Sequence, residues 1–312
     1  PRGACVVLSR SVRDRERIMP LFVAFRPDIV IHAAALKHVP YLEADWSEGI
    51  KTNIFGSVNV TDAAVAAGAK IFVLISTDKA IEPVSMLGAT KRFAEMYTQS
   101  RDAEFVAEAS GMRLVAVRFG NVLGSNGSVV PKFKAQIARG GPITVTSPDM
   151  IRYFMTIPEA CDLVLTAASH APADGPEAER AAVYVLKMGQ PMRIMDLAER
   201  MIRLAGFEPG EDIEIVVSGV RPGERLNEIL FARDEPMAET GLDGVMAAKP
   251  IFAGRARIQG WLARLDAALK TDDRATALAV LDEAIPDFSR RGEAQPDAPA
   301  QPASLPAAAT RP

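Results

Sequence analysis

The sequence predicts an α/β fold in which a doubly wound parallel sheet is joined to a smaller C-terminal α/β region. Short, continuous apolar runs alternate with segments of helical periodicity along the first 120 residues. Such continuous apolar runs are expected for strands whose two faces are both covered by helices, as in a parallel sheet. The length of 312 residues, with 48% hydrophobic and 24% charged residues, suits a globular protein of one large domain or two modest ones.

The predicted elements follow one another in a regular order. Strand-like runs cover residues 4–9, 27–35, 70–77 and 113–120, and helical patterns cover 14–25, 47–67 and 85–109. Repetition of strand, helix and strand predicts parallel pairing. Later in the chain we expect helices up to about residue 138 and over 158–169 and 192–205, with strands over 182–189 and 213–219. Over 289–312 the composition collapses into Ala, Pro, Gln and Asp, which predicts a disordered tail.

The composition excludes several classes of function. A net charge of −3 does not favour a general nucleic-acid surface. Two cysteines, Cys5 and Cys161, and three histidines without ligand spacing give neither a disulfide framework nor a metal site. No apolar run approaches the ~20 residues needed to span a bilayer, and no signal peptide is visible. We therefore expect no metal, no nucleic-acid partner, no membrane segment in this chain, and a reducing, cytoplasmic compartment.

The stretch "STDKAIEPVSMLGATK" (76–91) places reactive groups at the end of a strand. The third strand-like run delivers Thr77, Asp78 and Lys79 at its carboxyl end, and the following helix brings up Lys91. Ligands of parallel α/β sheets bind beyond the carboxyl ends of the strands. Taken singly, each residue also has an ordinary interpretation as a solvated lysine or a helix cap. Together they indicate a site for acid–base chemistry.

Six motifs in order carry a resemblance to a known family. They are "HAAALKHVP" (32–40), "KTNIFGSVNV" (51–60), "STDKAIEPVSMLGATKRFAE" (76–95), "VRFGNVLGSNGSVVPKF" (117–133), "IRYFMTIPEA" (151–160) and "GVRPGERLNE" (219–228). Together they resemble the extended short-chain dehydrogenase/reductase superfamily. More narrowly, they resemble the UDP-N-acetylglucosamine 4,6-dehydratases of bacterial capsule and O-antigen synthesis. The resemblance covers about residues 10–250.

The resemblance implies a domain organisation and a reaction. Residues 1–120 would form a partial Rossmann core that lacks its first two strands, and residues 121–288 a mixed region that binds a sugar nucleotide. A bound NAD or NADP would take a hydride from carbon 4 of a UDP-N-acetylhexosamine and return it to carbon 6 after loss of water. The rival interpretations are an NAD-dependent 4-epimerase on the same fold and a non-catalytic remnant that binds a sugar nucleotide.

By resemblance, four residues would carry the chemistry. Lys79 would be the base at carbon 5, and desolvation would have to lower its pKa towards neutrality. Asp78 would be the acid at the carbon-6 hydroxyl, with a raised pKa and in a coupled titration with its lysine neighbour. Thr77 would hydrogen-bond the carbon-4 oxygen. Lys91 would hold the nicotinamide ribose and supply positive charge.

One position departs from most of the superfamily. Four residues before Lys91, where a tyrosine would exchange the carbon-4 proton, this chain has Leu87. The membrane-anchored branch of these dehydratases also lacks the tyrosine, so the substitution alone does not imply an inactive enzyme. The carbon-4 proton would then leave through Thr77, Asp78 or water, and these three routes stay open.

The resemblance also assigns residues to the two ligands. The cofactor would be contacted by Ala33, Ala34, Lys37, Ser76, Lys91 and Val122. The UDP-sugar would be contacted by Lys37, Asn121, Ser128, Val129, Thr146, Arg152, Arg221 and Glu224. Arg152 and Arg221 can each clamp a pyrophosphate in two-pronged fashion. Asn53 would play a supporting role, and His32 is expected to be a packed histidine and not a base.

The match has a gap at its start. The glycine-rich turn that holds the dinucleotide pyrophosphate is absent, and residues 1–10 align with the third strand of the family. Ser11 stands where the family usually has an aspartate near the adenine. We therefore expect this chain to bind NAD(P) weakly or not at all. The activity would belong to a complete, membrane-anchored and homo-oligomeric parent at the cytoplasmic face of the inner membrane.

Overall fold

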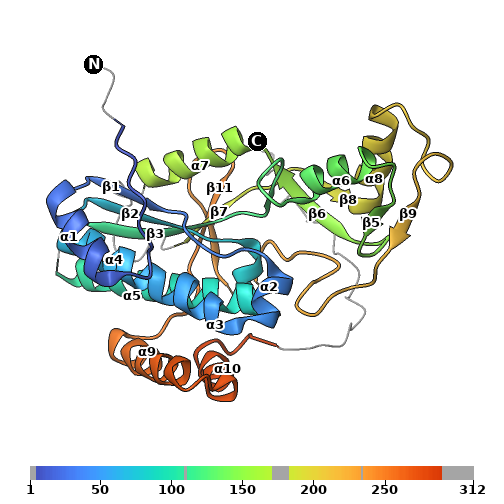
Figure 1. Cartoon of the computed structure of the whole chain (residues 1–312). Coiled ribbons are helices and arrows are strands. Elements are labelled where there is room, and N and C mark those ends of the chain that lie inside the picture. The colour runs from blue at the N-terminus through green and yellow to red at the C-terminus, as the bar shows by residue number, and fades with distance from the viewer. Residues whose placement is uncertain (1–4, 109–110, 171–182, 233–234, 290–312) are drawn as a thin grey trace, which may run out of the picture.

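The computed structural model describes residues 5–108, 111–170, 183–232 and 235–289 (Figure 1). The expected tail falls outside these residues, apart from Ser289. At the centre lies a six-stranded sheet with the order β1-β2-β3-β7-β11-β10. Its strands are β1 (Ile29–His32), β2 (Ile71–Ile75), β3 (Arg113–Arg118), β7 (Val183–Leu186), β10 (Met237–Glu239) and β11 (Val245–Ala248). The first four pair in parallel and the last two antiparallel, which confirms the predicted parallel α/β sheet.

Helices cover both faces of this sheet. One face carries α1 (Arg15–Phe25), α4 (Gly56–Ala66) and α5 (Met86–Ala107), and the other carries α7 (Ile157–His170) (Figure 1). Every residue of β3 is therefore buried, as its uninterrupted apolar run requires. Beyond α5 lies a hairpin of α9 (Arg255–Lys270) and α10 (Arg274–Ala284), whose apolar side chains join the core around α5. The doubly wound arrangement is confirmed.

A smaller α/β region lies beside the main sheet (Figure 1). It contains the three-stranded sheet β4 (Asn121–Val122), β6 (Ile151–Met155) and β8 (Pro191–Arg193), and the two-stranded sheet β5 (Ile143–Val145) and β9 (Ile215–Val217). Helices α6 (Val129–Ile137) and α8 (Ile194–Leu204) pack on these strands around a separate apolar core. This is the smaller region that the sequence predicts after residue 120.

Two predicted elements differ from the structure. Residues 5–10 form no strand and are exposed, because the described part of the chain places no partner strand beside them. A strand needs hydrogen bonds from a neighbour, whatever its apolar content. The helix expected over 47–67 is divided into α3 (Trp46–Gly49), a π-helical segment (Ile50–Phe55) and α4. Short helices at Val39–Ala44 (α2) and Asp78–Ala80, and the α9–α10 hairpin, were not predicted.

Candidate active site

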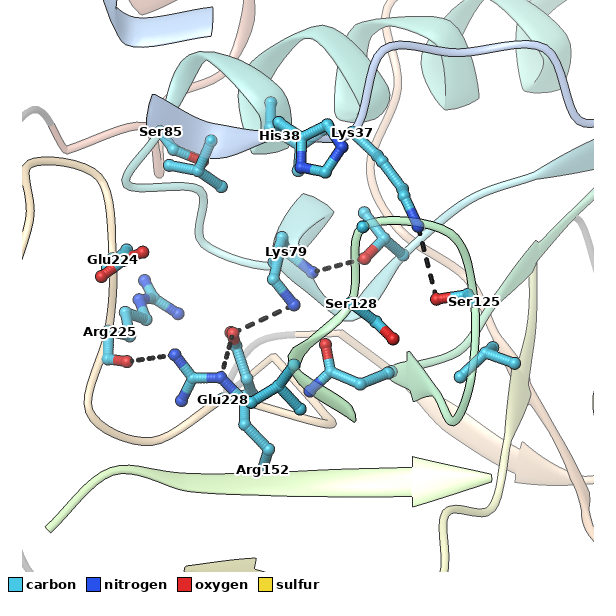
Figure 2. A pocket seen from close by; sticks show the side chains of 18 of the residues that line it. Lys37, His38, Lys79, Ser85, Ser125, Ser128, Arg152, Glu224, Arg225 and Glu228 are labelled. Carbon is cyan, nitrogen blue, oxygen red and sulfur yellow. Dashed lines mark hydrogen bonds and ion pairs between the residues drawn. The ribbon is translucent and has the colours of Figure 1, made fainter. Parts of the chain in front are cut away.

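A cavity of about 520 Å³ lies between the carboxyl ends of β2 and β3 and the smaller α/β region (Figure 2). Most of the residues expected around the two ligands line it. They are Ala33, Lys37, Ser76, Thr77, Lys79, Lys91, Asn121, Val122, Ser128, Val129, Thr146, Arg152, Arg221 and Glu224. Ala34 and Asp78 do not line it. The structure thus brings together side chains that are far apart in the sequence, in a space of the size that holds a small ligand.

The turn after β2 fixes the direction of the reactive side chains. The backbone amides of Ser76 and Asp78 donate to the carbonyls of Val117 and Phe119, so the chain continues beside β3 past the end of β2. Asp78 then opens a single 3-10 turn. Gly88 of α5 packs directly against this turn, because a Cβ at that position would fall on the carbonyl oxygen of Lys79.

Lys79 lies between two carboxylates. Its Nζ is 3.0 Å from Asp78 Oδ1 and 3.0 Å from Glu228 Oε1, and Figure 2 shows the contact with Glu228. Burial alone would lower the pKa of Lys79, but the two carboxylates outweigh it and raise that pKa above its ordinary value. The lowered pKa expected for a carbon-5 base is therefore wrong for the unliganded protein. Asp78 makes the larger contribution to this rise, and Glu228 adds to it as a second anion that the spacing of the sequence did not bring to this amine.

Asp78 lies behind the cavity wall. Its side chain is 3% exposed, and its Oδ1 accepts hydrogen bonds from Thr77 Oγ1 (2.8 Å) and Lys79 Nζ (3.0 Å). Among the described residues, Oδ2 has no hydrogen-bond partner. Burial and the negative charge of Glu228 raise the pKa of Asp78 despite the neighbouring ammonium. A raised pKa is what an acid at carbon 6 requires.

Lys91 reaches the cavity from α5. Its Nζ donates to the carbonyl oxygen of Ile75 at 2.8 Å, at the end of β2. Burial lowers the pKa of Lys91 to about 8, although Glu95 partly offsets this effect. Leu87 lies one turn earlier on the same helix, lines the cavity and is 4% exposed. An apolar side chain therefore occupies the wall where the superfamily tyrosine would stand.

The two arginines expected at the pyrophosphate differ in their surroundings. Arg152 is 9% exposed, and its guanidinium donates to the carbonyls of Ile151, Leu226 and Arg225 at 2.7–2.9 Å. Its Nε is also 3.4 Å from Glu228 Oε1. Because these partners occupy most of its donors, the two-pronged clamp expected of Arg152 is not available here.

Arg221, the other arginine expected at the pyrophosphate, lines the cavity and is exposed. Partial burial and, to a smaller extent, the charge of Arg221 lower the pKa of Lys132, which lies nearby. Two neighbours have unused hydrogen-bonding capacity, because Ser128 Oγ and Glu224 Oε2 have no partner among the described residues. Ser128 also stands at the N-terminus of the nine-residue helix α6, where backbone amides favour an anion.

A third wall is built by the loop after β1. Lys37 Nζ donates to Ser125 Oγ at 3.3 Å, which joins this loop to the loop after β4 (Figure 2). Asn53, in the π-helical segment, holds the loop in place through both the amide and the carbonyl of Leu36. Its supporting role stays a prediction, with these two hydrogen bonds as its structural basis. His32 is buried, bonds Ser57 and has a pKa lowered to about 3 by burial, which confirms that it is a packed histidine.

Several groups at the cavity escaped the sequence analysis, among them Lys132, Arg225 and Glu228. Glu228 ends the motif "GVRPGERLNE", and Arg225 lies inside it, yet only Arg221 and Glu224 of that motif were singled out. The signal was present, because a glutamate in a motif already assigned to the site is a candidate for it. In the described residues, no group of three or more His, Cys, Asp or Glu side chains could hold a metal ion. No helix among them is long and apolar enough to cross a membrane.

Comparison with known proteins adds an independent line of support. The family model described as "Polysaccharide biosynthesis protein" matches residues 3–250. The probable polysaccharide biosynthesis protein EpsC of Bacillus subtilis is 42% identical over 282 residues, which are 86% of this chain and 45% of that protein. The capsular polysaccharide biosynthesis protein CapD of Staphylococcus aureus is 50% identical over 225 residues, 72% of this chain and 36% of that protein. The chain thus spans less than half the length of these two relatives.

A shorter relative and a solved structure are also similar. A UDP-N-acetylglucosamine 4,6-dehydratase (inverting) of Campylobacter jejuni is 36% identical over 242 residues, 77% of this chain and 66% of that protein. The X-ray structure of Pen from Bacillus thuringiensis has a TM-score of 0.67 and 35% identity, and covers 80% of this chain and 73% of that one. These likenesses extend over both the main sheet and the smaller region.

Proposed function

Since the chain belongs to the polysaccharide biosynthesis protein family, we propose that its cavity binds a UDP-N-acetylhexosamine, which the whole protein converts by 4,6-dehydration. One observation carries the proposal. A single cavity joins the groups suited to acid–base chemistry, Thr77, Lys79 and Lys91, to a wall with an exposed arginine and unpartnered polar atoms. The dehydratase relative of Campylobacter jejuni supports the choice of sugar nucleotide.

The anionic part of the ligand would lie against α6. Arg221 and Lys132 provide two exposed cations there, and the N-terminus of α6 adds its free backbone amides. Ser128 and Glu224 would use their unpartnered oxygens on the phosphate and the ribose hydroxyls. Arg152 acts differently from the expectation, because it holds the segment 225–228 in place as one wall of the site.

The sugar ring would then lie over the turn after β2. Burial raises the pKa of Asp78, as an acid for the departing carbon-6 hydroxyl requires, and its contact with Thr77, which lines the cavity, gives the proton a path to the sugar. Thr77 lies at the cavity surface within reach of the carbon-4 oxygen. Lys79 faces the ring from the same turn, but it is charged and can take a proton from carbon 5 only as it gives one up.

The residues beside Lys91 fit the nicotinamide end of NAD or NADP. Lys91, Ser76, Ala33 and Val122 line one end of the cavity, and small side chains there leave room for a flat ring. When bound, such a cofactor takes up a hydride from carbon 4 and returns it to carbon 6. Lys91 would orient the ribose through its ammonium group, for which the carbonyl of Ile75 is already a second partner.

We place the whole protein at the cytoplasmic face of the inner membrane as a homo-oligomer. One observation supports a reducing compartment, because both cysteines are free and exposed. Chemical cross-linking and fractionation of the whole protein test the oligomer and the membrane location.

A calorimetric titration of this chain with UDP-N-acetylglucosamine and with UDP tests the site. We expect both ligands to bind, because both carry the diphosphate. If neither ligand binds, the proposal is contradicted. Turnover is then followed by mass spectrometry after NAD⁺ or NADP⁺ is added. Loss of one water from the sugar indicates dehydration, an epimerised sugar of unchanged mass indicates the epimerase, and binding without turnover indicates a site that does not react in this chain.

A further inference from the structure

Asp78, Lys79 and Glu228 form one cluster of three ionisable groups, here called the proton cluster. The Nζ of Lys79 is the centre, at 3.0 Å from a carboxylate oxygen on each side. The side chains of Asp78 and Glu228 are 3% and 4% exposed, so water screens neither of them. Two buried carboxylates therefore share one ammonium group, a situation in which their own repulsion matters.

We propose that Glu228 is a positioning residue that fixes where the protons of this cluster lie: on Lys79 as an ammonium and on Asp78 as a neutral acid. The use of this arrangement in the reaction rests on the proposed function. The arrangement itself is a property of the unliganded chain.

The charges around each carboxylate decide which of the two keeps a proton. Glu228 faces two cations, Lys79 and Arg152, whose Nε is 3.4 Å from the same Oε1, and the charge of Arg225 acts on it as well. Among the described residues, Asp78 contacts a single cation, Lys79, and also accepts a hydrogen bond from Thr77. Glu228 is therefore the anion, with a pKa lowered by Lys79 and Arg152 despite its burial, whereas the pKa of Asp78 is raised by burial and by Glu228.

The backbone aims Glu228 at this point. The amide of Ile151 donates to the carbonyl of Leu226 at 2.9 Å, and the Arg152 guanidinium donates to the carbonyls of Leu226 and Arg225. Strand β6 thus holds the segment 225–228 from two sides. The other charged groups that line the cavity near the turn are Lys91, on α5, and Arg225, which bonds the carbonyls of Ile81 and Glu82.

This arrangement gives Lys79 a route to act as a base while it stays charged. As the carbon-5 C–H bond breaks, its electron pair remains on the sugar as the enolate of the carbon-4 ketone, and a new N–H bond forms on Lys79. In the same step Lys79 passes another of its protons to Glu228 Oε1, which becomes a neutral acid. The enolate electron pair then forms a double bond between carbons 5 and 6 as the carbon-6 C–O bond breaks, and Asp78, by way of Thr77, supplies the proton with which the hydroxyl leaves as water.

The experiment measures the protonation states directly, without any ligand. Carboxyl ¹³C and ammonium ¹⁵N signals are followed by NMR from low to high pH in labelled protein, and Asp78→Asn assigns the aspartate signal. In the wild-type chain we expect Asp78 to titrate above the ordinary aspartate value and Lys79 above the ordinary lysine value. In Glu228→Gln both values should fall, by about one pH unit or more, because a charge at close range is removed.

The matched control is Glu224→Gln, which removes a carboxylate from the same motif with no contact to Lys79. It should leave the Asp78 titration unchanged. An Asp78 value that moves equally in both variants, or in neither, overturns the proposal. If Glu228→Gln does not fold, the wild-type chain still tests the proposal. A Lys79 signal that titrates below the ordinary lysine value would then be enough to overturn the proposal. If the chain does not bind UDP-N-acetylglucosamine, the proposed function is rejected. The proposal about Glu228 is still tested by the titrations, because they use no ligand.

Discussion

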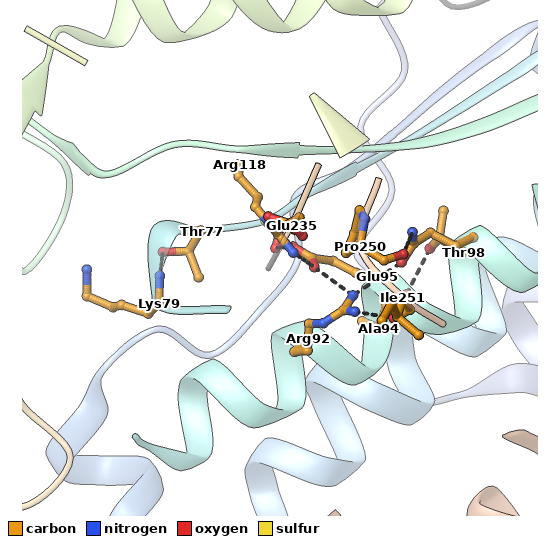
Figure 3. Close-up of polar contacts among 12 residues, drawn as sticks. Thr77, Lys79, Arg92, Ala94, Glu95, Thr98, Arg118, Glu235, Pro250 and Ile251 are labelled. Atoms are coloured by element: carbon orange, nitrogen blue, oxygen red, sulfur yellow. Dashed lines mark hydrogen bonds and ion pairs between the residues drawn. The ribbon is translucent and has the colours of Figure 1, made fainter. Parts of the chain in front are cut away.

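Arg118 and Glu95 form a doubly hydrogen-bonded ion pair inside the protein. Nε and Nη2 of Arg118 donate to Oε1 and Oε2 of Glu95 at 2.8 and 2.7 Å (Figure 3). The two side chains are 2% and 0% exposed. Glu95 also accepts a hydrogen bond from Ser76 at the cavity wall, and Arg118 binds Glu235 near the C-terminal strands. The pair therefore ties the floor of the site to the far end of the sheet.

Arg118→Met is expected to destabilise the fold strongly. It leaves Glu95 and Glu235 without their shared cation in a dry environment, and breaking a buried pair of this kind costs about 3–5 kcal/mol. Urea unfolding measures the change in free energy. The control is Arg203→Met, which removes an exposed pair with Glu199 and should cost less than about 0.5 kcal/mol. Equal losses in the two variants would contradict the importance of the buried pair.

Gly88→Ala is expected to disturb the turn that carries Lys79. The new Cβ would fall on the Lys79 carbonyl and lie 2.8 Å from the Cβ of Pro83, so α5 or the turn must move. Forced overpacking typically costs about 1–3 kcal/mol. Gly260→Ala is the matched control, because it lies in the exposed part of α9 with nothing within 4 Å, and alanine there should stabilise by about 0.5–1 kcal/mol. Thermal unfolding measures the change in stability of each variant. A loss for Gly88→Ala with a gain for Gly260→Ala supports the close packing at Gly88, and changes of the same sign would contradict it.

The sequence was informative where one local segment carried the signal. The continuous apolar runs predicted the parallel strands, because burial on both faces leaves a pattern along a single strand. The spacing of Thr77, Lys79 and Lys91 likewise predicted a shared site, since a strand end and the next helix are adjacent in the chain. Residues 5–8 show the limit: their apolar content matched a strand, but whether a strand forms depends on a neighbour that the segment itself does not specify.

Contacts between distant segments could not be read in the same way. Glu228 lies across the cavity and, together with Asp78, raises the pKa of Lys79. No residue near Lys79 in the sequence indicates that this second carboxylate will be there. The sequence predicted that the guanidinium of Arg152 would hold a phosphate, but the structure shows that it donates to backbone carbonyls of the segment 225–226. Both errors have one cause: the electrostatics of a buried group depend on all its neighbours in space.

Arg221→Met is expected to weaken UDP binding without unfolding the chain. Arg221 is exposed at the cavity, and a lost charge-assisted hydrogen bond is worth about 1.5–3 kcal/mol, or roughly a tenfold to hundredfold increase in Kd. Calorimetry measures Kd, and thermal unfolding checks the fold. Arg139→Met, exposed beyond the end of α6 and away from the cavity lining, is the matched control and should leave Kd unchanged. A similar Kd in wild type and Arg221→Met would count against the phosphate position.

Lys91→Met is expected to change how stability depends on pH. The pKa of Lys91 is lowered from 10.5 to about 8, so between these values the unfolded chain binds a proton that the folded chain does not. Stability of the wild type therefore gains from Lys91 as pH rises through this window, by about 3 kcal/mol at most. Urea unfolding at pH 7, 9 and 10.5 measures the difference between wild type and variant. The difference should shift in favour of the wild type with rising pH, and a difference that stays constant over this range would contradict the effect of burial on Lys91.

Leu87→Tyr tests whether Lys91 is poised to activate a group on the cavity wall. Leu87 lies four residues before Lys91, so a tyrosine there would share its helix face and bring a phenol near the amine. The larger side chain should cost about 1–3 kcal/mol of stability. Burial raises the pKa of a phenol at this position, and the ammonium form of Lys91, which a phenolate would itself stabilise, offsets part of that rise. Ultraviolet difference titration against the wild type isolates this phenol, and adding Lys91→Met should move its pKa upwards. A phenol that titrates at the same pH with and without Lys91 would show that the two groups do not interact.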